Sequence, residues 1–188
     1  MKTAFLEIAL TRKTNFRFTC NQNVIVADVS DKDKNEIDSI LKKHGVIQIT
    51  DNAGAVRRDS IACVAFNTCP LALAESQRYL PDLISKMEPI LQKYGLEDDN
   101  ISVRMTGCPN GCGRPYVAEV GFVGTAYGHY NMHLGGDRSG TRLNKIFKEN
   151  INESTILHEL DELFKVYSKE RKKQETFGDY AMRAGWVK

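Results

Sequence analysis

Four of the five cysteines form two close pairs, and this spacing is the clearest indication of chemistry in the sequence. Cys63 and Cys69 are separated by five residues, Cys108 and Cys112 by three, and 38 residues lie between the pairs. Four thiolates are the usual ligands of an iron–sulfur cluster. Structural zinc is an alternative, although zinc knuckles usually contain a C-x2-C turn, which is absent here. Buried thiols without a metal are the third interpretation, because free cysteine often packs in protein cores.

The second pair lies in a glycine-rich segment, residues 104–114, whose composition favours neither helix nor strand. Its three glycines allow unusual backbone torsions and Pro109 removes a donor, so we expect a tight loop with accessible amides. Such amides can donate hydrogen bonds to cluster sulfurs. Pro70 predicts a helix over residues 70–79, and the dipole at the start of that helix would favour a thiolate at Cys69.

Other residues that could do chemistry give weaker indications. Cys20 lies outside both pairs and is expected to be structural. His129 and His133 are four positions apart in a predicted strand, with no third ligand nearby, so structural roles are expected for both. The loop of residues 135–142 has a G-x4-G spacing but lacks the Lys-Ser/Thr of a phosphate-binding loop. Five arginines are either partners for the carboxylates of a large anionic cofactor or ordinary surface residues: Arg57, Arg58, Arg114, Arg138 and Arg142.

The composition is that of an ordinary globular protein. A chain of 188 residues, 41% apolar and 27% charged, can form one domain, or one domain plus a small lobe. The net charge of +2 gives no argument for nucleic-acid binding, and no apolar run approaches the roughly 20 residues that span a bilayer.

The cysteine count and the N-terminus indicate a cytoplasmic protein. Five cysteines is an odd number, which argues against a disulfide framework, and Glu7 interrupts the apolar start, so no signal peptide is expected. The basic run Lys165–Lys173 is expected to be a solvated helix end, with docking of an acidic partner as the alternative.

Residues 1–55 are expected to form a small lobe of their own. Ser30 followed by Asp33 resembles a capping box that starts a helix, and Gly45 is expected to end that helix. The turn-rich segment Asp51–Gly54 is the candidate boundary. The predicted elements are a helix or extended lead-in over 1–13, strands over 16–19 and 24–27, a helix over 31–44 and a strand over 46–49.

Residues 56–188 alternate unevenly between strand and helix patterns, which favours an α+β fold with a mixed β-sheet flanked by helices. Asn152 or Ser154 is expected to cap the last long helix. The predicted elements are helices over 70–79, 81–94 and about 154–173, strands over 101–105, 116–123 and 127–134, and a loop over 135–140.

The cysteine segments resemble those of a known family. Ala62–Ala72 and Thr106–Gly113 are similar to the cluster-binding signature of nitrite and sulfite reductase hemoproteins. The resemblance is greatest to the hemoprotein (beta) subunits of assimilatory, NADPH-type sulfite reductases. It also extends to Thr19–Asn23, Tyr130–Gly136, Gly140–Arg142 and Phe177–Gly185, and so covers nearly the whole chain.

The resemblance implies a fold and a set of site residues. The fold is the family's 4Fe–4S domain at residues 56–188, with a ferredoxin-like half-lobe before it at residues 1–55. Cys112 would bridge the cluster to the iron of siroheme, which makes it the expected catalytic residue. The expected cluster ligands are Cys63, Cys69, Cys108 and Cys112, and the expected siroheme contacts are Gln22, Asn23, Asn110, Gly111 and Cys112.

The same resemblance implies an activity and partners. The reaction would be the six-electron reduction of sulfite to sulfide, in sulfur assimilation and cysteine biosynthesis. Electrons would come from a flavoprotein reductase subunit or from ferredoxin, and neither nucleic acid nor a membrane is expected as a partner. Nitrite reduction within the same family is the alternative activity.

One departure from the family limits these expectations. Family members are much longer, and their first half carries most of the basic residues that bind sulfite and the siroheme carboxylates. The chain therefore resembles the C-terminal portion alone and is expected to be inactive without the other half. A non-catalytic module with metal-free or zinc-bound cysteines is the alternative of a different class.

Overall fold

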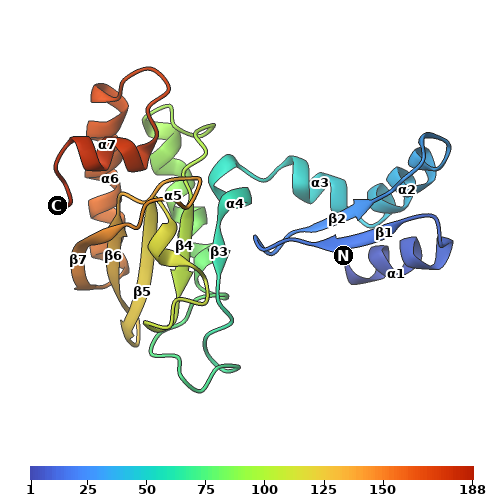
Figure 1. The fold of residues 1–188 in the computed structure, drawn as a ribbon, viewed down its shortest axis with the longest axis horizontal. Coiled ribbons are helices and arrows are strands. Elements are labelled where there is room, and N and C mark those ends of the chain that lie inside the picture. Colours follow the sequence, from blue (N-terminus) through green and yellow to red (C-terminus); the bar gives the residue numbers. More distant parts are fainter. The chain divides into compact units, whose positions relative to one another are not determined.

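The computed structural model describes residues 1–188 and divides into two compact units, Met1–Ala53 and Gly54–Lys188. The chain runs once through the first unit and then builds the second, as the colours of Figure 1 show. Each unit has its own buried apolar cluster. None of the helices is both long and apolar enough to cross a membrane.

The N-terminal unit is a two-stranded antiparallel ribbon with helices. Its core consists of Ile8, Ile37 and Ile40, which come from the first two helices. Its elements are α1 (Lys2–Thr11), β1 (Asn15–Phe18), β2 (Val24–Ala27), α2 (Asp31–Lys43) and α3 (Val46–Asp51).

The predicted lead-in helix, hairpin strands and second helix of this unit are confirmed, but the strand predicted over 46–49 is wrong. Gly45 adopts a left-handed conformation with φ of 68° and ends α2, as expected. The chain then turns directly into α3, with Val46 buried and Ile49 60% exposed. A short apolar run fits a strand and a helix equally well by periodicity, which is why the sequence was ambiguous here.

The C-terminal unit is built on one five-stranded mixed sheet in the order β3-β4-β5-β6-β7. Strands β3, β4 and β5 run parallel to one another, and β6 and β7 are antiparallel additions. Its elements are α4 (Ala55–Asp59), β3 (Ile61–Ala62), α5 (Leu80–Lys93), β4 (Val103–Thr106), η1 (Pro115–Val117), β5 (Val120–Ala126), β6 (His129–Leu134), β7 (Lys145–Ile151), α6 (Glu153–Glu170) and α7 (Phe177–Arg183).

One face of this sheet carries the core. Side chains alternate across a strand, so residues paired across neighbouring strands line up in rows on one face. Helices α5 and α6 pack against each other and contribute their apolar stripes to the same cluster. The buried rows are Val103, Val120 and Leu134, and Met105, Phe122 and Met132. The expected α+β fold with a mixed sheet and flanking helices is thus confirmed.

Several elements of this unit differ from the sequence predictions. No α-helix forms over 70–79, because the amides of Leu73 and Ala74 both donate to the carbonyl of Gly107 instead of to their own turn. Helix α6 starts after the Asn152 cap, as predicted, but ends at Glu170. Strand β7 and helix α7 were not predicted. Strand β7 is a charged edge strand, a composition that protects sheet edges but hides the strand pattern.

Candidate functional site

The two cysteine pairs leave the sheet at the same edge. Because β3 and β4 are parallel neighbours, with Ala62 paired to Met105, their carboxyl ends lie side by side. Cys63 directly follows β3, and Cys108 follows β4 by two residues. The long loop after β3 lies at the lower end of the sheet in Figure 1. The topology therefore brings together two loops whose contacting residues, Cys63 and Gly107, are 44 positions apart in the sequence.

Gly107 joins the two loops. Its amide donates a hydrogen bond of 3.1 Å to Sγ of Cys63, and its carbonyl accepts from the amides of Leu73 and Ala74 at 2.8 and 3.0 Å. A Cβ at this position would lie 2.6 Å from the carbonyl oxygen of Ala74, so only glycine fits. Gly107, which directly precedes Cys108, is thus hydrogen-bonded to both ends of the loop that carries Cys63 and Cys69.

The glycine loop returns to the same junction at Gly113. A Cβ on Gly113 would collide with the carbonyl oxygen of Met105 and lie 3.2 Å from the amide nitrogen of Cys63. The amide of Cys63 in turn donates to Met105 at 3.2 Å. The loop therefore begins and ends beside Cys63, with Cys108 and Cys112 on its two arms.

Tyr116 braces the tip of this loop. Its hydroxyl donates to the carbonyl of Pro109 at 2.8 Å. A Cβ on Gly111 would lie only 2.8 Å from a ring carbon of Tyr116, so the ring packs directly against this glycine. Gly111 has φ of 70°, a conformation that favours glycine. Burial raises the pKa of the Tyr116 hydroxyl, which keeps it a neutral donor. The expected tight loop is confirmed, and Tyr116 is a supporting residue that the sequence did not single out.

The four thiols differ in accessibility. Cys108 is buried, Cys63 and Cys69 are half-buried, and Cys112 is exposed, and none of them forms a disulfide. Cys69 does not precede a helix, so the dipole expected there is absent; its amide instead donates to Ala65 at 2.8 Å within a turn. No group of three or more His, Cys, Asp or Glu side chains is arranged around a single metal ion.

The other expected cofactor contacts lie in two places. Asn110 is exposed at the tip of the glycine loop, next to Gly111. Gln22 and Asn23 lie in the β1–β2 hairpin of the N-terminal unit, where the amide of Asn23 donates to the Thr19 hydroxyl at 3.1 Å. Gln22 has φ of 62°, so the hairpin turn constrains its backbone.

Several residues considered from the sequence serve the fold. Arg57 pairs with Glu88, Arg138 with Asp59, and Arg142 with Asp179 at 2.7 Å while also donating to the carbonyl of Gly135. His133 is buried edge-on against Tyr116, and burial lowers its pKa. His129 bonds to the carbonyl of Tyr127.

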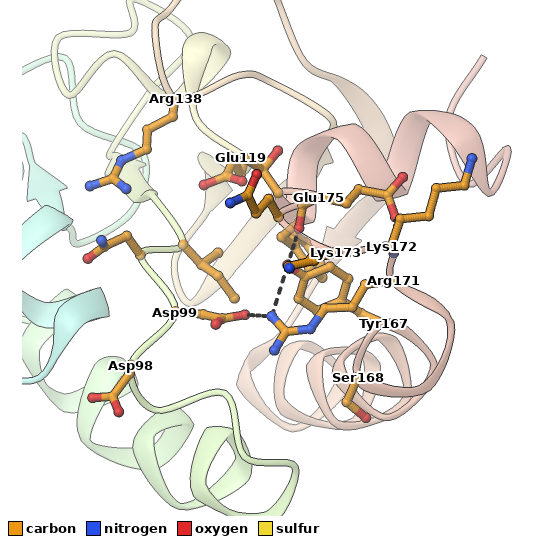
Figure 2. A pocket seen from close by; sticks show the side chains of 15 residues that line it. Asp98, Asp99, Glu119, Arg138, Tyr167, Ser168, Arg171, Lys172, Lys173 and Glu175 are labelled. Carbon is orange, nitrogen blue, oxygen red and sulfur yellow. Dashed lines mark hydrogen bonds and ion pairs between the residues drawn. The ribbon is translucent and has the colours of Figure 1, made fainter.

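A cavity of about 610 Å³ lies at the opposite edge of the sheet, where β4 and β5 begin. Figure 2 shows Glu119 inside it, with Arg138 on one wall and Lys172 and Lys173 on the other. Part of the basic run noted in the sequence therefore lines this cavity, where Arg171 pairs with Asp99.

Glu119 fixes the segments that surround this cavity. Its carboxylate accepts from the amides of Ser102 and Gly178 at 2.9 and 3.0 Å, and its own amide donates to the Ser102 hydroxyl. Only 1% of the residue is exposed, and burial raises the pKa of its carboxyl. No sequence motif identified Glu119, because in the sequence a glutamate that is buried in the fold looks the same as an exposed one.

Comparison with known proteins identifies relatives over the whole chain. Residues 53–188 match a family model described as the nitrite and sulphite reductase 4Fe-4S domain. Three curated relatives are each described as a sulfite reductase [NADPH] hemoprotein beta-component: one from Leptospira biflexa, 60% identical, one from Vibrio parahaemolyticus, 52% identical, and one from Staphylococcus carnosus, 52% identical. Each similarity covers 100% of this chain but 34%, 32% and 33% of the relative, so the chain spans about a third of their length.

A solved structure shows the same fold. The NirA protein of Mycobacterium tuberculosis superposes with a TM-score of 0.77 over 98% of this chain and 35% of its own. The sequence identity is 23%, so this likeness concerns the fold alone.

Proposed function

The chain belongs to the nitrite and sulphite reductase 4Fe-4S domain family, and on this premise we propose that it is the cluster-bearing C-terminal part of a sulfite reductase hemoprotein. Relatives that are 60% and 52% identical carry that description, and the chain covers about a third of each. The activity belongs to a protein of the relatives' full length. We extend the proposal to the domain division at residues 1–55 and 56–188, which the two compact units support.

One observation carries the proposal: both cysteine pairs stand on loops that leave neighbouring parallel strands and are joined at Gly107. Four thiols on two converging loops are the donor set of an iron–sulfur cluster, and the amide of Gly107 already donates to one of the sulfurs. These residues fit the group that the family description names. The proposed ligands are Cys63, Cys69, Cys108 and Cys112.

Cys112 is proposed as the residue shared between the cluster and siroheme. It is the exposed thiol of the four, on the arm of the glycine loop that returns to Cys63. Asn110 and Gly111, at the tip braced by Tyr116, and Gln22 and Asn23, in the β1–β2 hairpin, are proposed to contact siroheme. When bound, the two cofactors would supply an electron relay and an iron centre for the six-electron reduction of sulfite to sulfide, and the electrons themselves would come from a donor protein.

The other residues of this chain hold the cysteine loops in position. The paired loops hold the thiols at one sheet edge, and Tyr116 holds the loop tip through the carbonyl of Pro109. The buried rows of β4, β5 and β6 pack the sheet from which these loops emerge. Positioning of the cofactors is therefore the contribution that we propose for this part of the protein.

The electron donor, pathway and location are proposed from the descriptions of the relatives. Their names specify NADPH, which supports a flavoprotein reductase subunit as the electron donor, with ferredoxin as the other donor class. We propose a cytoplasmic protein of sulfur assimilation and cysteine biosynthesis. Because the family description includes nitrite, nitrite reduction is the second candidate activity. A metal-free or zinc-binding module without catalysis is the alternative of a different class.

The test is an assay with reduced methyl viologen as electron donor, on a full-length protein that contains this chain and on the 188-residue chain alone. The proposal predicts sulfide from sulfite with the full-length protein and none with the chain alone. Sulfide production by the chain alone would contradict the proposal that the activity requires the full-length protein. A full-length protein that loads siroheme and cluster but reduces neither sulfite nor nitrite would overturn the proposed activity.

A further inference from the structure

Asn144 is a buried asparagine that directly precedes β7, on the face of the sheet opposite the main core. Gly121 lies between the core residues Val120 and Phe122, so a side chain at Gly121 would point away from that core. A Cβ at this position would lie 2.9 Å from Nδ2 of Asn144 and would collide with the carbonyl oxygen of Pro115. The lack of a side chain at Gly121 therefore allows both segments to pack directly on the sheet.

Asn144 holds η1 along its whole length. Its side-chain amide donates to the carbonyls of Pro115 at 2.6 Å and Ala118 at 2.9 Å, so both hydrogens have backbone acceptors. Its backbone amide donates to the carbonyl of Tyr116 at 2.8 Å. The side chain also interacts with the buried ring of His133. Three consecutive contacts from one residue therefore fix the backbone of η1 on the sheet.

Tyr116, in the middle of η1, extends this support to the tip of the glycine loop, residues 109–111. Its hydroxyl donates to the carbonyl of Pro109 at 2.8 Å, and its ring packs against Gly111. The same ring meets His133 edge-on, with 5.5 Å between the ring centroids. Asn144 thus fixes the backbone from which the tyrosine side chain reaches the tip.

The base of the glycine loop is held by different contacts. At one end, the amide of Gly107 donates to Sγ of Cys63. At the other end, Gly113 packs against the carbonyl of Met105. Neither contact involves η1 or Asn144. The tip and the base therefore have separate supports, and the support of the tip can be weakened without disturbing the base.

We propose that Asn144 is a positioning residue for the tip of the glycine loop and acts through Tyr116. The inference rests on the proposed function, in which Asn110 and Gly111 contact siroheme. A tip that is held in place before siroheme binds loses less conformational freedom on binding, so the protein retains siroheme more tightly. Because the base holds the cluster ligands, Asn144 affects the retention of siroheme more than that of the cluster.

The first test measures the tip itself, by nuclear magnetic resonance of the metal-free 188-residue chain. We expect backbone order parameters near the rigid value of about 0.85 for residues 110–112. Asn144→Ala should lower them towards about 0.6, and so should Tyr116→Phe, which removes one hydroxyl and keeps the ring. The amide of Gly107, at the base, should be unaffected. Tip order parameters that stay unchanged in Tyr116→Phe would overturn the proposal, even if Asn144→Ala failed to fold.

The second test follows the cofactors in a full-length protein that contains this chain. The rate of siroheme loss during dialysis is measured by visible absorption, and labile sulfide per chain reports the cluster. Asn144→Ala should speed siroheme loss by about tenfold, and Tyr116→Phe by about threefold, with labile sulfide retained. Because both substitutions remove the same support, the double variant should lose siroheme no faster than Asn144→Ala alone.

Asn152→Ala is the matched control variant. It also removes an asparagine side chain that holds backbone, since Oδ1 of Asn152 accepts from the amide of Thr155 and caps α6. It should lower stability but leave the tip order parameters and siroheme retention unchanged. Equally fast siroheme loss in Asn152→Ala and Asn144→Ala, parallel loss of labile sulfide, or additive effects in the double variant would each contradict the proposal.

The two tests separate this inference from the proposed function. An unsubstituted full-length protein that binds no siroheme would refute the proposed function. The order parameters of the metal-free chain would still decide whether Asn144 holds the tip, because that measurement requires no cofactor.

Discussion

The amide of Gly107 donates a hydrogen bond of 3.1 Å to Sγ of Cys63, although the two residues are 44 positions apart in the chain. This bond links the two cysteine loops directly. It also explains why a glycine precedes Cys108, since any side chain there would collide with Ala74 and Ala65. The arrangement of the thiols therefore depends on a residue that is not itself a ligand.

Gly107→Ala should weaken cluster binding without removing a ligand. The added methyl group would lie 2.6 Å from the Ala74 oxygen and 2.9 Å from Cβ of Ala65, so the loop that carries Cys63 and Cys69 must move. Residues that orient metal ligands typically change affinity by 10- to 100-fold, so we expect iron retention against a chelator to fall by about tenfold or more.

The matched control for this substitution is Gly54→Ala. A Cβ on Gly54 has one neighbour, Oε1 of Glu88, at an ordinary contact distance of 3.6 Å. Iron retention should therefore stay at the level of the unsubstituted chain. Equal retention in Gly107→Ala and Gly54→Ala would show that the Gly107 bond has no part in holding the site.

Cys112→Ser in the full-length protein should abolish turnover. Serine presents a hard oxygen, which is a poor ligand for an iron–sulfur centre, and Cys112 is the proposed link to siroheme. The measurement is sulfite reduction with reduced methyl viologen, together with the visible spectrum of siroheme. Cys20→Ser is the control, because Cys20 is also an exposed cysteine but lies outside both pairs, and it should retain full activity. Activity in Cys112→Ser would remove the basis for the shared-ligand assignment.

Much of the architecture could be predicted from the sequence because its signals are local. Gly45 ends α2, Asn152 caps α6 through its side chain, and alternating residues mark β6 and most of β5, although the start predicted at residue 116 falls in η1. The failures occur where distant contacts decide. Leu73 and Ala74 follow Pro70 in a segment that resembles a helix, but both of their amides donate to the carbonyl of Gly107. No local pattern reveals a partner that is more than 30 positions away in the sequence.

For the candidate site, the sequence indicated the types and spacing of the expected ligands, but not the residues that hold their loops in place. The thiols and the glycine loop could be identified, and the structure brings their loops to one edge of the sheet. Tyr116 and the carbonyl of Met105 could not be identified, because their roles arise from packing across strands. Glu119 was missed for the same reason, since a buried charge is recognised only through its partners.

Glu119→Gln should destabilise the C-terminal unit by about 1–3 kcal/mol. The glutamine amide group can accept only through its oxygen, so one of the two buried amides of Ser102 and Gly178 would lose its acceptor. Urea unfolding at neutral pH measures the change. Glu97→Gln, an exposed substitution in the same unit, is the control and should change the unfolding free energy little. A Glu119→Gln protein as stable as the control would contradict the structural role of this carboxylate.

Stability in acid should depend on Glu175. Hydrogen bonds from the Arg183 guanidinium and the Lys172 amide lower the pKa of the Glu175 carboxyl from 4.5 to about 2. A lowered folded-state pKa stabilises the folded chain above pH 4.5, and this contribution is lost as pH falls from 4.5 towards about 2. The difference in unfolding free energy between the unsubstituted chain and Glu175→Gln should therefore shrink over that interval. A difference that stays constant with pH would refute the assignment.

The four paired cysteines are proposed to hold one 4Fe–4S cluster, and metal analysis of the reconstituted chain measures that cluster itself. Purified chain would be supplied with iron, sulfide and zinc together, desalted, and assayed for iron, labile sulfide and zinc. We expect four iron and four sulfide per chain, as the family description implies, and loss of both when Cys63 and Cys108 are replaced by serine. One equivalent of zinc without sulfide, or iron loading that survives the double substitution, would contradict it.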